Sequence, residues 1–167
     1  AGGTHEPIDP VRYISNRSSG KMGYALAEAA RDRGAKVTLV TAPTSLPEPA
    51  GFDVVKVGTA QEMRRAVEKV TPQADALVMA AAVADYRPTK AAKDKIKKGE
   101  AGLTLKLECT VANDIKASDS GFGADTNRVT IIDREGKVDS LPLLPKREVA
   151  ERVLDRVVEL LPKPKSR

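Results

Sequence analysis

Cysteine, histidine and tryptophan are nearly absent from the 167-residue chain, which has one Cys, one His and no Trp. A single thiol, Cys109, can form neither an internal disulfide nor a cysteine-based metal cluster. Its place in the alternating run LTLKLEC favours a small buried side chain, because a nucleophilic thiol would need a histidine partner. With His5 as the sole imidazole, zinc chemistry and histidine-rich catalysis are not expected.

Long apolar runs are also lacking, since none reaches the roughly 20 residues that a membrane-spanning helix needs. The first residues, AGGTHEPIDP, have neither the basic start nor the apolar middle of a signal peptide. We therefore expect a cytoplasmic protein without a membrane partner. Aromatic residues make up 3% of the chain, too few for a base-stacking surface, so nucleic acid is not an expected partner either.

The chain has a net charge of +5, and its lysines cluster between Lys90 and Lys98 in the sequence KAAKDKIKK. This local excess suits a small polyanionic ligand such as a nucleotide. Hydrophobic residues make up 41% and charged residues 31%, which indicates one soluble, folded domain over residues 1–167.

Hydrophobic periodicity predicts three helices: residues 21–33, a helix capped by Thr59 with Glu62 in a capping box, and residues 146–161. Strands are predicted at residues 36–41, 53–57, 76–84 and 103–107, with a hairpin from 129–133 into Val138. Residues 1–19 are predicted to be a long loop. The alternation of strand and helix predicts an α/β fold with a mainly parallel sheet, and residues 76–84 its central strand.

One junction breaks this pattern, because LTLKLECT runs directly into VANDI and both segments look strand-like. No helix lies between them to make the crossover that a parallel pair requires. Either Thr110 and Val111 flank a hairpin turn without turn residues, or the sequence lacks residues at this point.

Two glycine-containing motifs near the N-terminus can hold an anion. In Ala1-Gly2-Gly3-Thr4, the glycines let backbone amides approach a phosphate, although an ordinary turn would use them equally well. Residues 15–23, SNRSSGKMG, precede a predicted helix whose N-terminus favours negative charge. They lack the first glycine of a P-loop and place Met22 where Ser or Thr would bind magnesium, so serine capping and glycine packing remain the alternative.

Two further segments carry candidate chemistry. Small residues at 80–84 leave room for a ligand at a strand end, and Asp85 after them can hold a cation or a hydroxyl group, or simply cap the next segment. The lysines of KIKK, residues 95–98, can neutralise charge on a transferring phosphate or carbonyl group, or form a solvated surface.

Taken in order, AGGTHEPIDPVRYISNRSSGKMG, AAVADYRP, KIKK, VANDI and GFGADTNRVTIID closely resemble the phosphopantothenoylcysteine synthetase family of coenzyme A biosynthesis. The resemblance implies a Rossmann-like three-layer sandwich with a hairpin extension for dimerisation. It also implies a homodimer, commonly fused to a flavin-dependent decarboxylase. The implied reaction uses CTP and Mg²⁺ to activate 4′-phosphopantothenate as an acyl-cytidylate, which the amine of cysteine then attacks.

The resemblance also assigns residues. Lys95 and Asn16 match the catalytic residues, and Asp85 matches the acid between substrate and cation. Phosphopantothenate would contact Asn16, Ala81, Ala82 and Asp85. The nucleotide would contact Gly3, Ser18, Gly20, Gly23, Met79, Ala80, Ala81, Asp85, Lys95 and Asn113.

The chain departs from the family pattern in two places. The strand that precedes Ala1 in the family is absent, and so is a segment at the 110/111 junction that supplies cytosine recognition. If that segment is truly deleted, a non-catalytic nucleotide-binding or dimerisation module is the alternative function. A nicotinamide-dependent oxidoreductase would share the fold, but the chain has no GxGxxG fingerprint.

Overall fold

Parallel strands form the centre of the computed structural model, which describes residues 1–96, 105–107, 124–132 and 138–161. Strand β1 (Gly2–Gly3) pairs with β6 (Ala81–Ala82), and β4 (Thr38–Thr41) pairs with β5 (Asp53–Lys56), both in parallel. The two pairs are joined where the N–H of Ala42 donates to the carbonyl of Ala1 at 2.9 Å. The strand order across the described part of this layer is therefore β5, β4, β1, β6.

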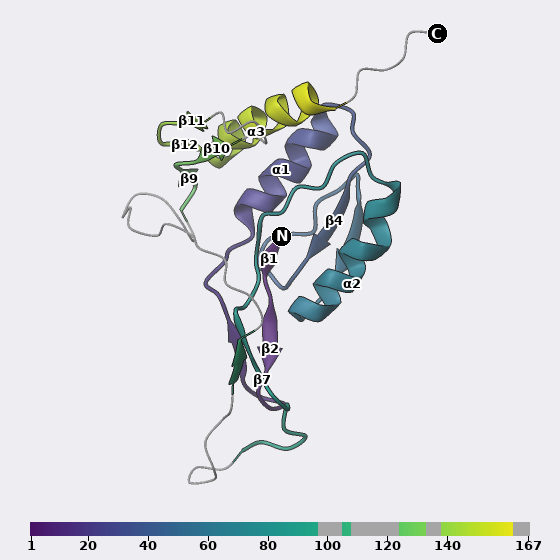
Figure 1. Cartoon of the computed structure of the whole chain (residues 1–167), viewed down its shortest axis with the longest axis vertical. Helices are drawn as coiled ribbons and strands as arrows, with labels where there is room; N and C mark the ends of the chain where they lie inside the picture. Colours follow the sequence, from purple (N-terminus) through teal and green to yellow (C-terminus); the bar gives the residue numbers. More distant parts are fainter. Residues whose placement is uncertain (97–104, 108–123, 133–137, 162–167) are drawn as a thin grey trace.

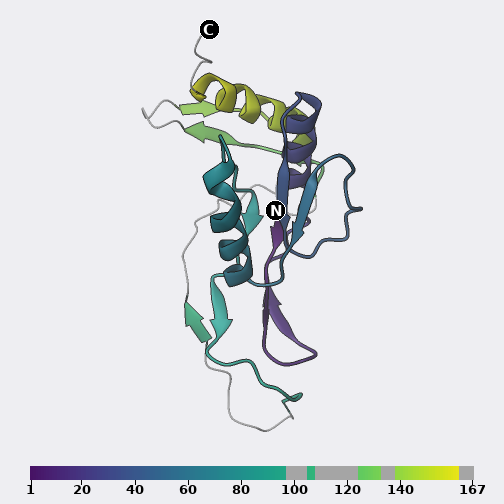
Figure 2. The ribbon, with the colours of Figure 1, turned by 90° about the vertical axis from the view of Figure 1, so that its right-hand side faces the viewer.

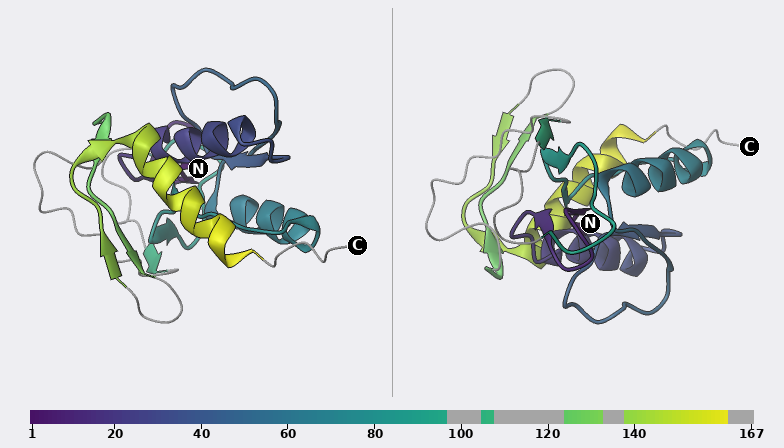
Figure 3. Two further views of the ribbon diagram at one scale, coloured as in Figure 1. Left: turned by 90° about the horizontal axis from the view of Figure 1, so that it is seen from above. Right: turned by 90° about the horizontal axis from the view of Figure 1, so that it is seen from below.

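Helices cover both faces of these strands (Figures 1 and 3). Helix α1 (Lys21–Asp32) lies on one face and α2 (Ala60–Val70) on the other, and α3 (Lys146–Leu160) packs across α1. A 3₁₀ turn, η1 (Thr71–Gln73), follows α2. The described helices include none that is long and apolar enough to cross a membrane. This arrangement confirms the predicted α/β three-layer class and all three predicted helices.

The apolar faces of the helices form two buried clusters. The larger cluster joins α1 to α3 through Leu26, Ala29, Ala150 and Leu154. The second cluster joins α1 to β4 through Tyr24, Ala27 and Leu39. The hydrophobic periodicity that predicted the helices therefore also marks the faces that pack.

Antiparallel hairpins extend the molecule away from the helices (Figures 1 and 2). Strand β2 (His5–Pro7) pairs with β3 (Tyr13–Ser15), and β7 (Tyr86–Pro88) pairs with β8 (Leu105–Leu107). The prediction of a loop over residues 1–19 was therefore wrong. Side-chain contacts hold the β2–β3 hairpin together, including the rings of His5 and Tyr13, which stack with centroids 4.0 Å apart.

A further hairpin lies beside α3. Strands β10 (Thr130–Ile132) and β11 (Val138–Ser140) pair antiparallel, which confirms the hairpin predicted from residues 129–138, and the turn between them lies outside the described residues. Strand β9 (Thr126–Asn127) pairs with β12 (Leu144–Pro145), a pairing that the sequence did not predict. The 110/111 junction also lies outside the described residues.

The predicted central strand over residues 76–84 was wrong in extent. Only Ala81 and Ala82 form strand β6, while Leu77, Val78 and Met79 are 52%, 41% and 58% exposed. The described partner of β6 is β1, which has two residues, so the ladder ends where β1 ends. Apolar composition alone could not show how short that partner is.

Candidate functional site

The carboxyl ends of β1 and β6 lie side by side, because the strands are parallel with Gly3 opposite Ala82. Thr4 follows β1 and is fully buried. Its N–H donates to the carbonyl of Ala82 at 3.2 Å, and its hydroxyl accepts from the N–H of Ala84 at 2.9 Å. Thr4 thus fixes the two strand ends, a role that the glycine motif before it does not predict. Open α/β sheets bind ligands at this edge, which makes it the candidate site.

Asn16 reaches this edge from the end of β3. Its side-chain amide Nδ2 donates to the carbonyl of Val83 at 3.0 Å. Gly3 lies against the same segment, since a Cβ on Gly3 would come within 2.9 Å of the Asn16 carbonyl oxygen and 3.4 Å of the Ser18 Cβ. The structure therefore brings together Gly3, Asn16 and Ser18, three of the residues that the sequence assigned to the site.

Helix α1 begins beside this cluster. Gly20, its N-cap residue, has φ +76° and makes no side-chain capping bond, and its N–H donates to Ser18 Oγ at 3.3 Å. A Cβ on Gly20 would come within 2.7 Å of Thr44 Cγ2. The Thr44 methyl group therefore fills the space beside Gly20. The helix N-terminus itself favours an anionic ligand through its dipole and its N–H groups.

A cationic edge flanks the start of α1. Lys21 Nζ donates to Asp125 Oδ1 at 2.5 Å, and this ion pair lowers the pKa of Asp125. Lys146, the first residue of α3, is buried with its Nζ donating to the carbonyl of Ala124 at 2.5 Å. Burial lowers the pKa of Lys146, and the nearby Lys21 lowers it further. The sequence predicted Lys146 only as the start of a helix, because nothing local marks its burial.

Gly23 has a packing role that the structure makes plain. A Cβ at this position would come within 2.5 Å of the Ala1 Cβ and 3.7 Å of the Ala80 Cβ. The glycine therefore lets α1 approach the parallel strands closely. This observation favours the packing interpretation of Gly23, while its assignment to the nucleotide stays a prediction.

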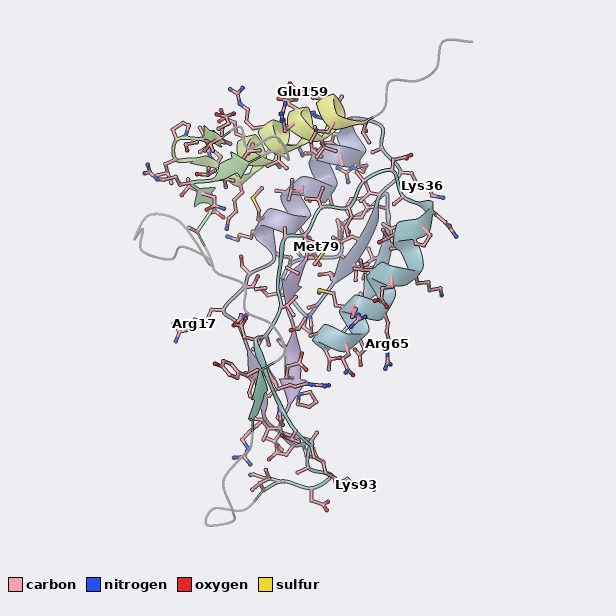
Figure 4. All side chains as sticks on the ribbon, viewed as in Figure 1. Arg17, Lys36, Arg65, Met79, Lys93 and Glu159 are labelled. Atoms are coloured by element: carbon pink, nitrogen blue, oxygen red, sulfur yellow. The ribbon has the colours of Figure 1, made fainter. Side chains whose placement is uncertain are left out.

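Two assigned residues flank strand β6: Met79 precedes it, and Asp85 follows it on the side of the carboxyl ends. Asp85 is half-buried, and Met79 lies at the centre of the view in Figure 4 with 58% of its surface exposed. Among the described residues, no group of three or more His, Cys, Asp or Glu side chains could hold a metal ion. Magnesium commonly binds through one or two carboxylates together with substrate phosphates, so the single carboxylate of Asp85 fits such an ion.

Lys95 lies away from this cluster. It is exposed, in the loop after β7 that packs against the turn between β2 and β3. Figure 4 shows its neighbour Lys93 at the tip of the extension, well below Arg17 at the base of that hairpin. The described contacts therefore do not bring Lys95 to Asn16. Asn113 lies outside the described residues.

A separate hollow of about 210 Å³ lies between the start of α2 and strands β2 and β7. Its lining includes the buried Glu6, whose carboxylate accepts from the N–H of Ala60 at 2.7 Å. None of the residues that the sequence assigned to the site lines it. We place the candidate site at the strand ends because Gly3, Asn16 and Ser18 converge there.

The fold defines a Rossmann-like α/β domain, and this edge is its candidate site for an anionic ligand. The family model described as the DNA/pantothenate metabolism flavoprotein C-terminal domain matches residues 1–110 and 106–161, and the chain belongs to this family. The resemblance seen in the sequence is thereby confirmed.

Relatives within this family include the Coenzyme A biosynthesis bifunctional protein CoaBC of Bacillus subtilis. It is 37% identical over 96% of this chain and 50% of its own length. The protein of the same name from Mycobacterium bovis is 61% identical over 61% of this chain and 25% of its own length. The chain thus spans at most about half the length of these relatives. A crystal structure of the C-terminal domain of a CoaBC protein matches 96% of this chain and 93% of its own with a TM-score of 0.79 and 36% identity.

Proposed function

We propose that this domain is a ligase that joins 4′-phosphopantothenate to cysteine and uses CTP as co-substrate. The match to the C-terminal domain of a coenzyme A biosynthesis protein, over nearly the full length of both chains, carries this proposal. The convergence of Gly3, Asn16 and Ser18 on the start of α1 supports it, because both substrates are anionic and need close backbone approach.

The reaction has two steps. A carboxylate oxygen of phosphopantothenate attacks the α-phosphorus of CTP, and pyrophosphate leaves to give an acyl-cytidylate. The amine of cysteine then attacks the acyl carbon, loses a proton, and CMP leaves. Positioning and electrostatic stabilisation supply most of the catalysis in such reactions, so no protein nucleophile is required. Mg²⁺ would neutralise charge on the triphosphate, with Asp85 as its protein ligand.

In this proposal each assigned residue keeps its task. Asn16 orients phosphopantothenate together with Ala81, Ala82 and Asp85, and Lys95 stabilises charge as the activated carbonyl forms or breaks down. The nucleotide is held by Gly3, Ser18, Gly20, Gly23, Met79, Ala80, Ala81, Asp85, Lys95 and Asn113.

The deciding experiment measures pyrophosphate release by the purified chain. Release should require phosphopantothenate and Mg²⁺, proceed without cysteine, and be faster with CTP than with ATP. Product formation should then require cysteine. A chain that binds CTP but releases no pyrophosphate would be a non-catalytic nucleotide-binding module.

Two variants test the residue roles. Lys95→Gln should lower the rate of pyrophosphate release about a hundredfold, the scale of removing one stabilising donor. Lys93→Gln, a matched change at an exposed lysine of the same loop, should leave the rate unchanged. Asn16→Asp should impair acyl-cytidylate formation, because it places a carboxylate against the Val83 carbonyl and beside the substrate carboxylate. Full activity of Lys95→Gln would show that the lysine loop is only a solvated surface.

We also propose that the chain, relative to its family, lacks a segment at the 110/111 junction. The Bacillus subtilis relative aligns over 203 residues, whereas 96% of this 167-residue chain is about 160 residues. The two family matches meet at residues 106–110. The intact mass of the purified protein tests this, because a retained segment would add the mass of about 40 residues.

The expected assembly is a homodimer in the cytoplasm, associated with a flavin-dependent decarboxylase half. The bifunctional names of the relatives support the second half. The exposed hairpin of β10 and β11 supports dimerisation, because an unpaired strand edge favours association with a second copy.

A further inference from the structure

The turn between β2 and β3 contains a carboxylate that is shielded from solvent. The side chain of Asp9 has no exposed surface. Its Oδ1 accepts from the backbone N–H groups of Val11 and Arg12, both at 2.9 Å. Its Oδ2 accepts from Arg12 Nε at 3.0 Å and from Arg12 Nη2 at 2.5 Å. A buried carboxylate with this many donors, two of them on one guanidinium, is held in a single orientation.

The same ion pair holds the lysine loop by its backbone. The N–H of Ile96 donates to Asp9 Oδ2 at 3.2 Å, and the carbonyl of Ile96 accepts from Arg12 Nη2 at 3.2 Å. Both polar backbone groups of the residue next to Lys95 are therefore bound to one charged pair. The two partners are more than 80 positions away in the sequence, so no local preference of the loop supplies these contacts.

A third bond fixes the loop at its other side. The N–H of Ala92 donates to the carbonyl of Ile8 at 2.8 Å, in the same turn. Residues 92 and 96 are thus both attached to the β2–β3 turn, with Lys95 between them. Adjacent Cα atoms are about 3.8 Å apart, so a fixed Ile96 restricts the Lys95 backbone to a small volume.

We propose that Asp9 is a positioning residue that acts through Lys95: it anchors the loop backbone to the β2–β3 turn at the far end of the extension, and this anchored position sets where the lysine can present its ammonium group. This inference rests on the proposed function for the role of Lys95, and on the geometry above for the attachment. The carboxylate is required rather than an amide. In Asp9→Asn, either orientation of the new side chain would turn an N–H₂ group towards donors that now meet an acceptor.

Hydrogen exchange at single amides tests the attachment without any activity. In Asp9→Asn and Asp9→Ala the amide of Ile96 should exchange about tenfold or more faster than in the wild type, the scale of losing one hydrogen bond to a charged group. Asp94→Asn, a change at an exposed carboxylate of the same loop, should leave this rate unchanged. Continued protection of the buried Met63 in α2 shows that the fold is intact. An unchanged Ile96 rate in both Asp9 variants would overturn the proposal.

A double-mutant cycle tests the consequence. Asp9→Asn should lower kcat/KM for cysteine-independent pyrophosphate release about tenfold, whereas the double variant with Lys95→Gln should be no slower than Lys95→Gln alone. If the double variant instead loses kcat/KM by the product of the two single losses, Asp9 acts independently of Lys95, as a merely structural residue would. That result would refute the inference.

The cycle also separates the two proposals. If the wild-type chain releases no pyrophosphate, the proposed function fails, and the exchange rates alone decide whether Asp9 fixes the loop. If the wild type is active and Lys95→Gln is equally active, the positioning role fails while the ligase assignment stands.

Discussion

Gly20 allows a sharp test of how the start of α1 is built. Its φ of +76° lies in the left-handed region, where an L residue costs about 1–2 kcal/mol, partly offset by about 0.4–1 kcal/mol from the less flexible unfolded chain. A Cβ at this position would also come within 2.7 Å of Thr44 Cγ2. Overpacking of this kind costs about 1–3 kcal/mol, so Gly20→Ala should lose about 2–4 kcal/mol of unfolding free energy.

Gly34 supplies the matched control. It has φ +85° just after α1, and nothing lies within 4 Å of the position of its Cβ. Gly34→Ala therefore carries only the backbone strain and should lose about 1 kcal/mol. The difference between the two variants isolates the contact with Thr44.

Urea unfolding followed by circular dichroism measures both losses, with unchanged m values as evidence that the unfolding transition is comparable. Thr44→Ser removes the Cγ2 methyl group, so in the Gly20→Ala background it should recover most of the difference from Gly34→Ala. Equal losses for the two glycine variants, or no recovery with Thr44→Ser, would refute the steric argument.

Three further outcomes are expected. Thr59→Ala should lose about 1 kcal/mol in urea unfolding because it removes the α2 capping box, and Thr59→Ser should not. Arg12 holds the pKa of Asp9 well below its usual range, so the ionised carboxylate contributes its full stability above about pH 4 and loses it as the pH falls through the depressed folded value. The stability difference between wild type and Asp9→Asn should hold from about pH 7 to 5 and shrink on further acidification; a difference that grows would contradict this. In light scattering, Val138→Asp should abolish the proposed homodimer and Tyr86→Asp should not, whereas the reverse result would move the interface to β7.

Local signals in the sequence predicted the three helices, strands β4, β5 and β8, and the β10–β11 hairpin. The capping box at Thr59 and the apolar periodicity around Leu26 and Leu154 depend on neighbours within one or two turns, so a sequence displays them. The hairpin of β2 and β3 was missed because its turn is held by the side chain of Asp9, and its strands have only three residues each. The central strand over residues 76–84 was predicted from apolar composition alone, which carries no information about a partner strand.

In the candidate site, too, local motifs predicted some residues, whereas burial by distant segments could not be predicted. The glycine and serine motifs, with the resemblance, predicted that Gly3, Asn16 and Ser18 would share one site, and the structure brings them together. The burial of Thr4 and of Lys146 could not be predicted, because each depends on backbone carbonyls contributed by distant segments.

The position of β1 inside the sheet has a consequence for synthesis on the ribosome. Gly2–Gly3 cannot pair with Ala81–Ala82 until about 80 further residues have been made, which takes about 4–16 s at roughly 5–20 residues per second. The apolar face of α1, with Leu26 and Ala29, waits longer still, until Leu154 of α3 emerges. During that interval the nascent chain exposes an amphipathic helix without its packing partner, which makes this segment the expected point of chaperone binding or of aggregation during translation.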